Sequence, residues 1–320
     1  MPIELHKEKS AGSVRTVTIG ATKDQGGTRL HTLTLGGETA LPFLAFEGTF
    51  PNRPALALEI RSRKPDDWSP LLYQAWGEGM QDPADWGRAA EAAGADLIYF
   101  VLSATKPDGS PNDAATARAD VRRVLQATGL PLAVVGPGQA ELDNELIVAV
   151  AEEAKGERLL IGICEDKNYR TIVAAALAND HLVQSKTPMD VNLSKQLVIL
   201  IHDMGLPLER IVMDPTTGAL GYGIEYGYSV MERLRLAALQ GDSMTQQPMM
   251  VNPGEEAWKV KESKVGEGVP DAWGDWSRRA LNWEALTAAT LVHSGANLVV
   301  LRHPETLRRV RLVIDDLVAA

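Results

Sequence analysis

Short apolar runs alternate with amphipathic stretches along the chain from residue 54 onward. The apolar runs read as eight strands, and they cover residues 55–60, 96–102, 131–135, 158–163, 181–184, 210–213, 247–251 and 297–301. Amphipathic stretches with helical spacing lie at residues 83–94, 112–128, 141–155, 168–179, 190–204, 276–293 and 304–318. Strands that are apolar on both faces are typical of a parallel sheet covered on both sides, so an α/β fold is predicted.

Eight strands, nearly all followed by a helical stretch, predict a (β/α)8 TIM barrel over residues 54–320, because eight strands close such a barrel. An open, doubly wound sheet is the alternative. A GxGxxG motif after the first strand would favour that alternative, whereas Gly136-Pro137-Gly138 lacks the third glycine. We therefore expect the barrel.

The first 53 residues follow a different pattern. Residues 13–21 and 28–35 alternate β-branched with polar side chains, and a segment that contains glycine, residues 22–27, separates them. Two alternating runs around such a turn indicate a β-hairpin. We expect residues 1–53 to form this hairpin and a connector, as an N-terminal extension of the barrel.

The composition narrows the function. The 320 residues include one cysteine, Cys164, so the chain alone cannot form an intramolecular disulfide or hold an iron–sulfur cluster. A formal net charge of -10 argues against nucleic acid as a partner. No apolar run approaches the ~20 residues of a membrane span, and the first residues lack the apolar stretch of a signal peptide, so we expect a cytoplasmic protein.

The chemistry of a TIM barrel gathers at the carboxyl ends of its strands. Polar residues and one glycine at or near these ends are candidate contacts for a cofactor or a partner: Asp166, Asn168, Asn192, Asp214, Thr216, Thr217, Gly218, Asn252 and Arg302. Asp and Asn are also common helix caps, and Asp166 could cap the helix at residues 168–179. No catalytic residue is assigned, and the six histidines show no metal-ligand spacing.

Residues 214–228, with the sequence DPTTGALGYGIEYGY, combine four glycines with three tyrosines. Glycine lets the backbone approach another molecule closely, and tyrosine is enriched at protein interfaces. We expect a docking loop here, with Tyr222 among its contacts. A flexible lid is the alternative.

This segment continues as SVMERLRLAALQGD and is followed by QPMMVNPGEEAWKVKES. Together with ALALEIRSRKPDDWSPLLYQAWGE, GICEDKNYRTIVAAALANDH and DVNLSKQLVILIHDMG, it resembles the small subunit of the corrinoid/iron–sulfur protein. The archaeal counterpart of that family is the delta subunit of the acetyl-CoA decarbonylase/synthase complex. The resemblance covers most of the chain.

The resemblance implies a barrel that pairs with a large corrinoid/iron–sulfur subunit as a heterodimer. The large subunit would carry the [4Fe–4S] cluster, and a corrinoid (cobamide) would lie between the two chains, over the mouth of this barrel. A methyltetrahydrofolate methyltransferase would supply the methyl group and acetyl-CoA synthase would receive it, in the reductive acetyl-CoA pathway of anaerobes. This chain would shield the cobalt from water.

Two other functions stay open from the sequence. One is a stand-alone pterin-dependent methyltransferase, in which Asp166, Asp214 and Asn252 would hold the pterin. The other is a purely architectural subunit.

Overall fold

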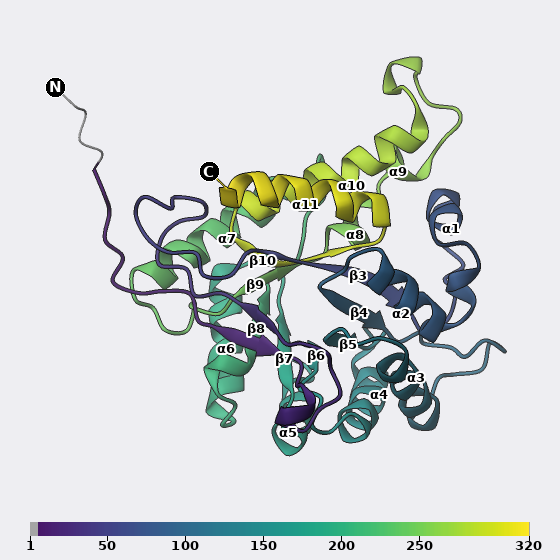
Figure 1. Ribbon diagram of the computed structural model, residues 1–320, viewed down its shortest axis with the longest axis horizontal. Coiled ribbons are helices and arrows are strands. Elements are labelled where there is room, and N and C mark those ends of the chain that lie inside the picture. The colour runs from purple at the N-terminus through teal and green to yellow at the C-terminus, as the bar shows by residue number, and fades with distance from the viewer. Residues whose placement is uncertain (1–5, 320) are drawn as a thin grey trace.

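Eight parallel strands close into a barrel in the computed structural model, which describes residues 6–319 (Figure 1). In their order around the barrel the strands are β10 (Ala296–Leu301), β3 (Ala55–Arg61), β4 (Leu97–Val101), β5 (Leu132–Val135), β6 (Leu160–Cys164), β7 (Leu182–Lys186), β8 (Ile211–Asp214) and β9 (Met249–Val251). The predicted (β/α)8 TIM barrel is confirmed. Residues 1–5 of the predicted N-terminal extension, and Ala320, lie outside the described residues.

Helices connect successive strands and surround the barrel (Figure 1). They are α1 (Pro70–Trp76), α2 (Pro83–Ala92), α3 (Ala114–Ala127), α4 (Ala140–Glu153), α5 (Tyr169–Asn179), α6 (Val191–Asp203), α7 (Ile224–Leu239), α8 (Pro253–Ala257), α9 (Lys261–Lys264), α10 (Trp276–His293) and α11 (Pro304–Ala319). Short 3-10 helices are η1 (Lys23–Gln25), η2 (Gly77–Gln81), η3 (Leu208–Arg210) and η4 (Asp271–Trp273).

Side chains of each strand alternate between two cores, as the pleat of a strand requires. In β3, Ala55 and Ala57 face the barrel interior, whereas Leu56, Leu58 and Ile60 pack against the surrounding helices. Both faces are buried, which explains why the strands read as continuous apolar runs in the sequence.

Helix α7 departs from the sequence-based expectation. The segment predicted as a docking loop or lid enters this helix at Ile224, so Tyr226 and Tyr228 lie on helical turns. The glycines around the start of α7 hide it in the sequence, because glycine is a poor helix former. Gly223 precedes the helix with a φ of 94°, in the left-handed region that glycine adopts most readily.

The predicted N-terminal hairpin is present, although its strands are short. β1 (Val17–Ile19) pairs with β2 (Leu33–Leu35) in antiparallel register. Val17, Ile19 and Leu35 are buried against the side chains that fill the barrel interior. The hairpin therefore closes the end of the barrel at which the strands begin.

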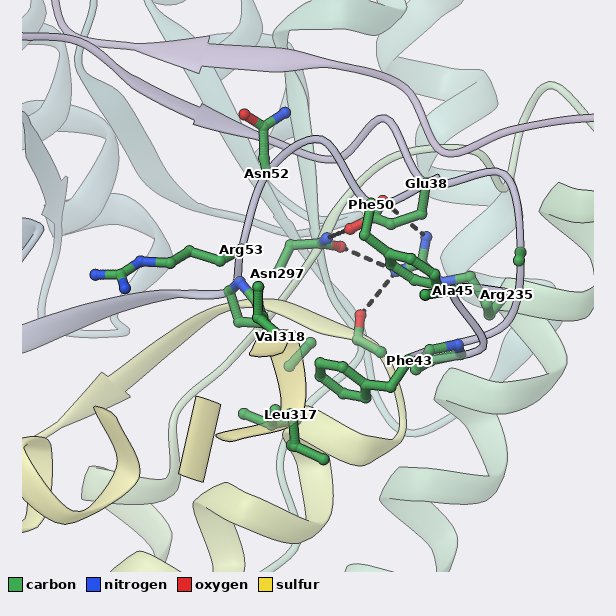
Figure 2. A pocket seen from close by; sticks show the side chains of 16 residues that line it. Glu38, Phe43, Ala45, Phe50, Asn52, Arg53, Arg235, Asn297, Leu317 and Val318 are labelled. Atoms are coloured by element: carbon green, nitrogen blue, oxygen red, sulfur yellow. Dashed lines mark hydrogen bonds and ion pairs between the residues drawn. The ribbon is translucent and has the colours of Figure 1, made fainter. Parts of the chain in front are cut away.

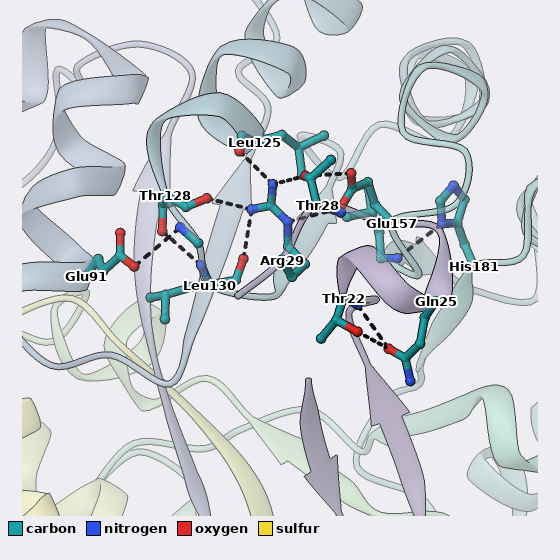
Figure 3. A network of polar contacts seen from close by, with 12 residues as sticks. Thr22, Gln25, Thr28, Arg29, Glu91, Leu125, Thr128, Leu130, Glu157 and His181 are labelled. Atoms are coloured by element: carbon teal, nitrogen blue, oxygen red, sulfur yellow. Dashed lines mark hydrogen bonds and ion pairs between the residues drawn. The ribbon is translucent and has the colours of Figure 1, made fainter. Parts of the chain in front are cut away.

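One arginine fastens this hairpin to the loops that precede β5 and β6 (Figure 3). The guanidinium of Arg29 donates hydrogen bonds to the carbonyl oxygens of Leu125 (2.6 Å), Thr128 (2.7 Å) and Leu130 (3.1 Å). Its Nε lies 3.0 Å from Oε2 of Glu157, and both side chains are buried. We call this network the floor clasp.

Candidate functional site

A polar cavity of about 600 Å³ opens where the strands of the barrel end. Its lining comes from the carboxyl ends of β3, β4, β5, β6 and β7 and from the residues that follow β9. We call it the mouth cavity. The position of this cavity agrees with the rule that TIM-barrel sites lie at the carboxyl ends of the strands.

A buried group of charges lies on one side of the mouth cavity. Glu59 at the end of β3 accepts hydrogen bonds from Nε (2.8 Å) and Nη2 (3.0 Å) of Arg302 and from Nε of Arg61 (2.8 Å). The guanidinium of Arg302 also lies 4.7 Å from the ring centre of Trp68. Arg302, a predicted contact residue, therefore uses its side chain to hold the mouth together.

A second polar group crosses the interior of the barrel below the mouth. The Tyr99 hydroxyl donates to Oε1 of Gln184 (3.2 Å), and Nε2 of Gln184 donates to Oδ2 of Asp214 (2.7 Å). Burial raises the pKa of Asp214 above the ordinary range of a carboxyl group, although Lys186 opposes this rise. Asp214, another predicted contact, is therefore a buried member of the hydrogen-bond network that joins Tyr99, Gln184 and Asp214.

Lys186 brings a positive charge into the mouth cavity. It follows Gln184 by two positions on β7, so both face the barrel interior. Asp214 is the main cause that raises the pKa of Lys186, and no ion pair within 4.0 Å holds its ammonium among residues 6–319. Burial disfavours the charge of Glu255, but Lys186 and Lys259 outweigh burial and lower the pKa of Glu255 to about 2. Lys186 can therefore donate hydrogen bonds to a ligand.

Three predicted contact residues lie in the turn after β8, where two of them bond to the backbone that follows the neighbouring strands β7 and β9. Oγ1 of Thr216 donates to the Thr187 carbonyl (2.5 Å), and Oγ1 of Thr217 accepts from the Asn252 amide (2.8 Å). A Cβ atom at Gly218 would lie 2.3 Å from the Gly223 carbonyl oxygen. This position therefore requires glycine because the turn packs closely, which is a structural reason.

Two predicted asparagines also have structural partners. Asn168 accepts from the Glu165 amide (2.8 Å) and donates to the Ile163 carbonyl (2.9 Å), so it holds the loop after β6. Asn252 accepts from the Glu255 amide (2.9 Å) as the N-cap of α8, while part of it lines the mouth cavity.

The remaining predicted residues are exposed. Asp166 and Asn192 lie on the surface, and Asp166 lines a smaller neighbouring cavity of about 250 Å³ that Lys186 also borders. Asp166 does not cap α5, because the N-cap position belongs to Asn168. Tyr222 lies before α7, and its hydroxyl donates to Oε2 of Glu262 (3.1 Å).

Of the residues chosen by the strand-end rule, Asn252 lines the mouth cavity, and the others use their side chains elsewhere or lie outside its lining. Glu59, Lys186 and Glu255 line the mouth cavity, although none is among the chosen candidates. The signal for Lys186 was the alternation Leu182, Gln184, Lys186, which gives one face of a buried strand an unusual polar end.

Cys164 is buried at the end of β6, and burial raises the pKa of its thiol. Within residues 6–319, no three His, Cys, Asp or Glu side chains gather closely enough to hold a metal ion. Nor does any helix described there have the length and apolar character needed to cross a membrane.

Asp143, on α4, lies behind the loop of residues 136–138, which lines the mouth cavity. Its side chain is buried, and its Oδ1 accepts a hydrogen bond from the Gly138 amide at 3.1 Å. Burial raises the pKa of this carboxyl group from 3.8 to about 6. The native state therefore holds this proton more tightly than the unfolded chain, and its stability falls between about pH 4 and pH 6 as the carboxyl group ionises.

Replacing Asp143 with asparagine should remove this loss, because a neutral amide can still accept from Gly138. We expect the free energy of unfolding of Asp143→Asn to exceed that of the wild type by about 1–2 kcal/mol more at pH 7 than at pH 4. Urea unfolding at both pH values measures the difference. Glu141→Gln, at an exposed position of the same helix, is the matched control and should leave the pH dependence unchanged. An unchanged pH dependence in Asp143→Asn would contradict the assignment.

Solved structures confirm the fold. Dihydropteroate synthase from Xanthomonas albilineans, in complex with 7,8-dihydropteroate, superposes with a TM-score of 0.57 at 14% identity, over 88% of this chain and 98% of that enzyme. The enzyme from Yersinia pestis gives a TM-score of 0.58 at 15% identity, over 85% of this chain and 97% of that one. At such low identity the likeness concerns the barrel alone.

Relatives with similar sequences identify the family of the chain. The acetyl-CoA decarbonylase/synthase complex subunit delta of Archaeoglobus fulgidus is 36% identical over 98% of this chain and 70% of its own length. That of Methanopyrus kandleri is 38% identical over 92% of this chain and 72% of its own length. Residues 16–310 match the family model described as CO dehydrogenase/acetyl-CoA synthase delta subunit. The chain therefore belongs to the family of CO dehydrogenase/acetyl-CoA synthase delta subunits.

Proposed function

We propose that this chain is the barrel-shaped subunit of a methyl carrier and that, with a larger partner chain, it encloses a corrinoid at the mouth cavity. The observation that carries this proposal is the family match over residues 16–310, to proteins named as subunits of the acetyl-CoA decarbonylase/synthase complex. In this function the chain acts in the acetyl-CoA pathway.

The chemistry of the mouth cavity supports a corrinoid. Its polar lining among the described residues combines arginine, lysine and carboxylate side chains with hydroxyl and amide side chains, and it includes no imidazole. Such groups suit hydrogen bonds to the amide-bearing edge of a corrin ring rather than ligation of cobalt. Lys186, Arg61 and the backbone near Gly138 would hold that edge. When bound, the corrinoid supplies the cobalt centre that carries the methyl group.

The size of the mouth cavity supports a shared site. Pockets of about 300–1,000 Å³ enclose drug-sized molecules, and a corrinoid is considerably larger. A cavity of about 600 Å³ would therefore cover only part of it and leave the remainder to a partner. This chain would exclude water from one face of the cofactor. We further propose that the complex is cytoplasmic and exchanges methyl groups with a methyltetrahydrofolate methyltransferase and with acetyl-CoA synthase.

Exposed aromatic residues at the same end of the barrel suit docking of the larger subunit. Tyr222, Tyr226 and Tyr228 are 53%, 66% and 37% exposed around the start of α7, and we call them the tyrosine rim. Buried tyrosines carry much of the binding energy of protein interfaces. The exposure of the rim therefore supports the docking function proposed for this segment, although much of it is helical.

Substituting the most exposed rim residue tests this docking. We expect Tyr226→Ala to weaken the affinity for the larger subunit at least tenfold, because a central aromatic residue is worth about 1.4 kcal/mol or more. Titration calorimetry with that subunit gives the affinity, and thermal melting verifies that the variant folds. Leu312→Ala, which truncates a 53% exposed side chain on α11, is the control and should bind normally. Equal loss in both variants would count against the rim.

The alternative of a stand-alone pterin-dependent methyltransferase finds less support. Asp166 is exposed outside the mouth cavity, and Asn252 caps α8. The third proposed pterin ligand, Asp214, is a buried acceptor, and Gln184 and Lys186 already compensate its charge. Calorimetry with methyltetrahydrofolate, followed by methyl transfer to free cobalamin, would reveal such an enzyme.

A further inference from the structure

Another cavity, of about 180 Å³, lies at the end of the barrel opposite the mouth. It borders Pro54, directly before β3, and Ala296, the first residue of β10. Figure 2 shows it between the connector that carries Phe43 and Phe50 and the last turn of α11, which carries Leu317 and Val318. We call it the floor cavity. Most of its wall is apolar.

Two buried charged side chains form the polar end of the floor cavity. Arg235, from α7, is 3% exposed, and Glu38, from the connector, is 7% exposed. Nη2 of Arg235 donates to the Gly295 carbonyl (2.7 Å) and to Oδ1 of Asn297 (2.9 Å). Oε1 of Glu38 accepts from Nδ2 of Asn297 (2.5 Å). Each charged group is therefore anchored on one side.

The other sides of these two groups are incompletely satisfied. Oε2 of Glu38 is buried and accepts no hydrogen bond. Nη1 of Arg235 lies 4.0 Å from it, beyond hydrogen-bond distance. A buried carboxylate oxygen without a donor is costly, so a native structure rarely leaves one without a reason. One acceptor and one donor side by side at the end of an apolar cavity form an incomplete recognition site.

We propose that the floor cavity binds a small aromatic molecule that ends in a primary carboxamide. The amide N–H would donate to Oε2 of Glu38, and the amide carbonyl oxygen would accept from Nη1 of Arg235. A carboxamide presents both functions on adjacent atoms, whereas a carboxylate would face Glu38 with like charge. The aromatic body would lie among Phe43, Phe50 and Leu317.

The volume fits one ring with a small head group. An apolar cavity of about 150 Å³ in another protein is known to hold benzene. The floor cavity, at about 180 Å³, is slightly larger and has a polar end. It does not touch the mouth cavity, so this site is independent of the proposed corrinoid function.

Calorimetry on the full chain with benzamide and benzoate as probes tests the proposal. We expect benzamide to bind with a Kd below about 1 mM and at least tenfold more tightly than benzoate, as a ligand of this size allows. Glu38→Gln should reverse this preference. The glutamine Oε1 would keep the bond from Asn297, and its Nε2 would place a second donor beside Arg235.

A gentler pair of variants locates the site if Glu38→Gln fails to fold. Phe43→Ala removes part of the cavity wall, and Phe46→Ala truncates an exposed residue of the same connector that does not line the cavity. Benzamide affinity should fall at least fivefold in Phe43→Ala and stay unchanged in Phe46→Ala. Absence of benzamide binding at millimolar concentration, benzoate bound as tightly as benzamide, or equal affinity in both phenylalanine variants would overturn the proposal.

Discussion

Glu59→Ala is expected to destabilise the protein by about 3–5 kcal/mol, because it removes one member of a buried ion pair and leaves the other charge without compensation. The Arg302 side chain is 6% exposed, and its guanidinium donates both of its hydrogen bonds to carboxylate oxygens of Glu59. Arg61 loses the same partner. Urea unfolding at pH 7, followed by circular dichroism, gives the free energy of unfolding.

The matched control for this variant is an exposed ion pair at the same end of the barrel. Asp66 is 78% exposed where it contacts Arg63, and exposed pairs contribute only about 0–1 kcal/mol. Asp66→Ala should therefore leave the unfolding curve nearly unchanged. A loss below about 1 kcal/mol in Glu59→Ala would show that Glu59 and Arg302 do not hold the mouth together.

Arg29→Met should cost about 3–4 kcal/mol of stability, because it removes the donor at the centre of the floor clasp but keeps the apolar stem. The carbonyl oxygens of Leu125, Thr128 and Leu130 then lose a charged donor in a buried place. Glu157 keeps its hydrogen bonds from Thr28, so its negative charge remains partly compensated after Arg29 is removed.

Hydrogen exchange distinguishes local from global effects of this variant. Amides of the hairpin and of the loops before β5 and β6 should lose protection in Arg29→Met, since the clasp joins these segments. Arg53→Met is the control, because Arg53 pairs with Asp315 at a half-exposed position, with side chains 49% and 47% exposed. Equal stability of Arg29→Met and Arg53→Met would contradict the clasp.

The barrel could be predicted from the sequence for a physical reason. Strands of a parallel barrel are buried on both faces, so each one stands out as a short apolar run between helical patterns. Helix α7 could not be predicted in this way, because the glycines around its start lower the helix propensity of the segment. The hairpin is recognised, but its pairing is confined to residues 17–19 and 33–35.

The site is less readable, because caps, loop anchors and ligand contacts use the same residue types. Asn168 and Asn252 follow strands as a ligand contact would, yet their side-chain hydrogen bonds hold local backbone. Thr217, after β8, accepts a hydrogen bond from the Asn252 amide and so holds the backbone after β9. The direction of the side chain decides between these roles, and a position at the end of a strand does not by itself reveal that direction. The alternation of side chains along β7 does reveal the direction, because residues two apart face the same side, and it indicates that Lys186 points into the barrel.

The central claim is that this chain covers a corrinoid only together with a larger subunit. Titration of cobinamide, followed by its visible spectrum, measures binding to the full chain alone and to the chain mixed with the larger subunit of its complex. The account predicts weak binding to the chain alone and stoichiometric binding to the pair. Tight, stoichiometric binding by the chain alone, or no gain on adding the larger subunit, would contradict it.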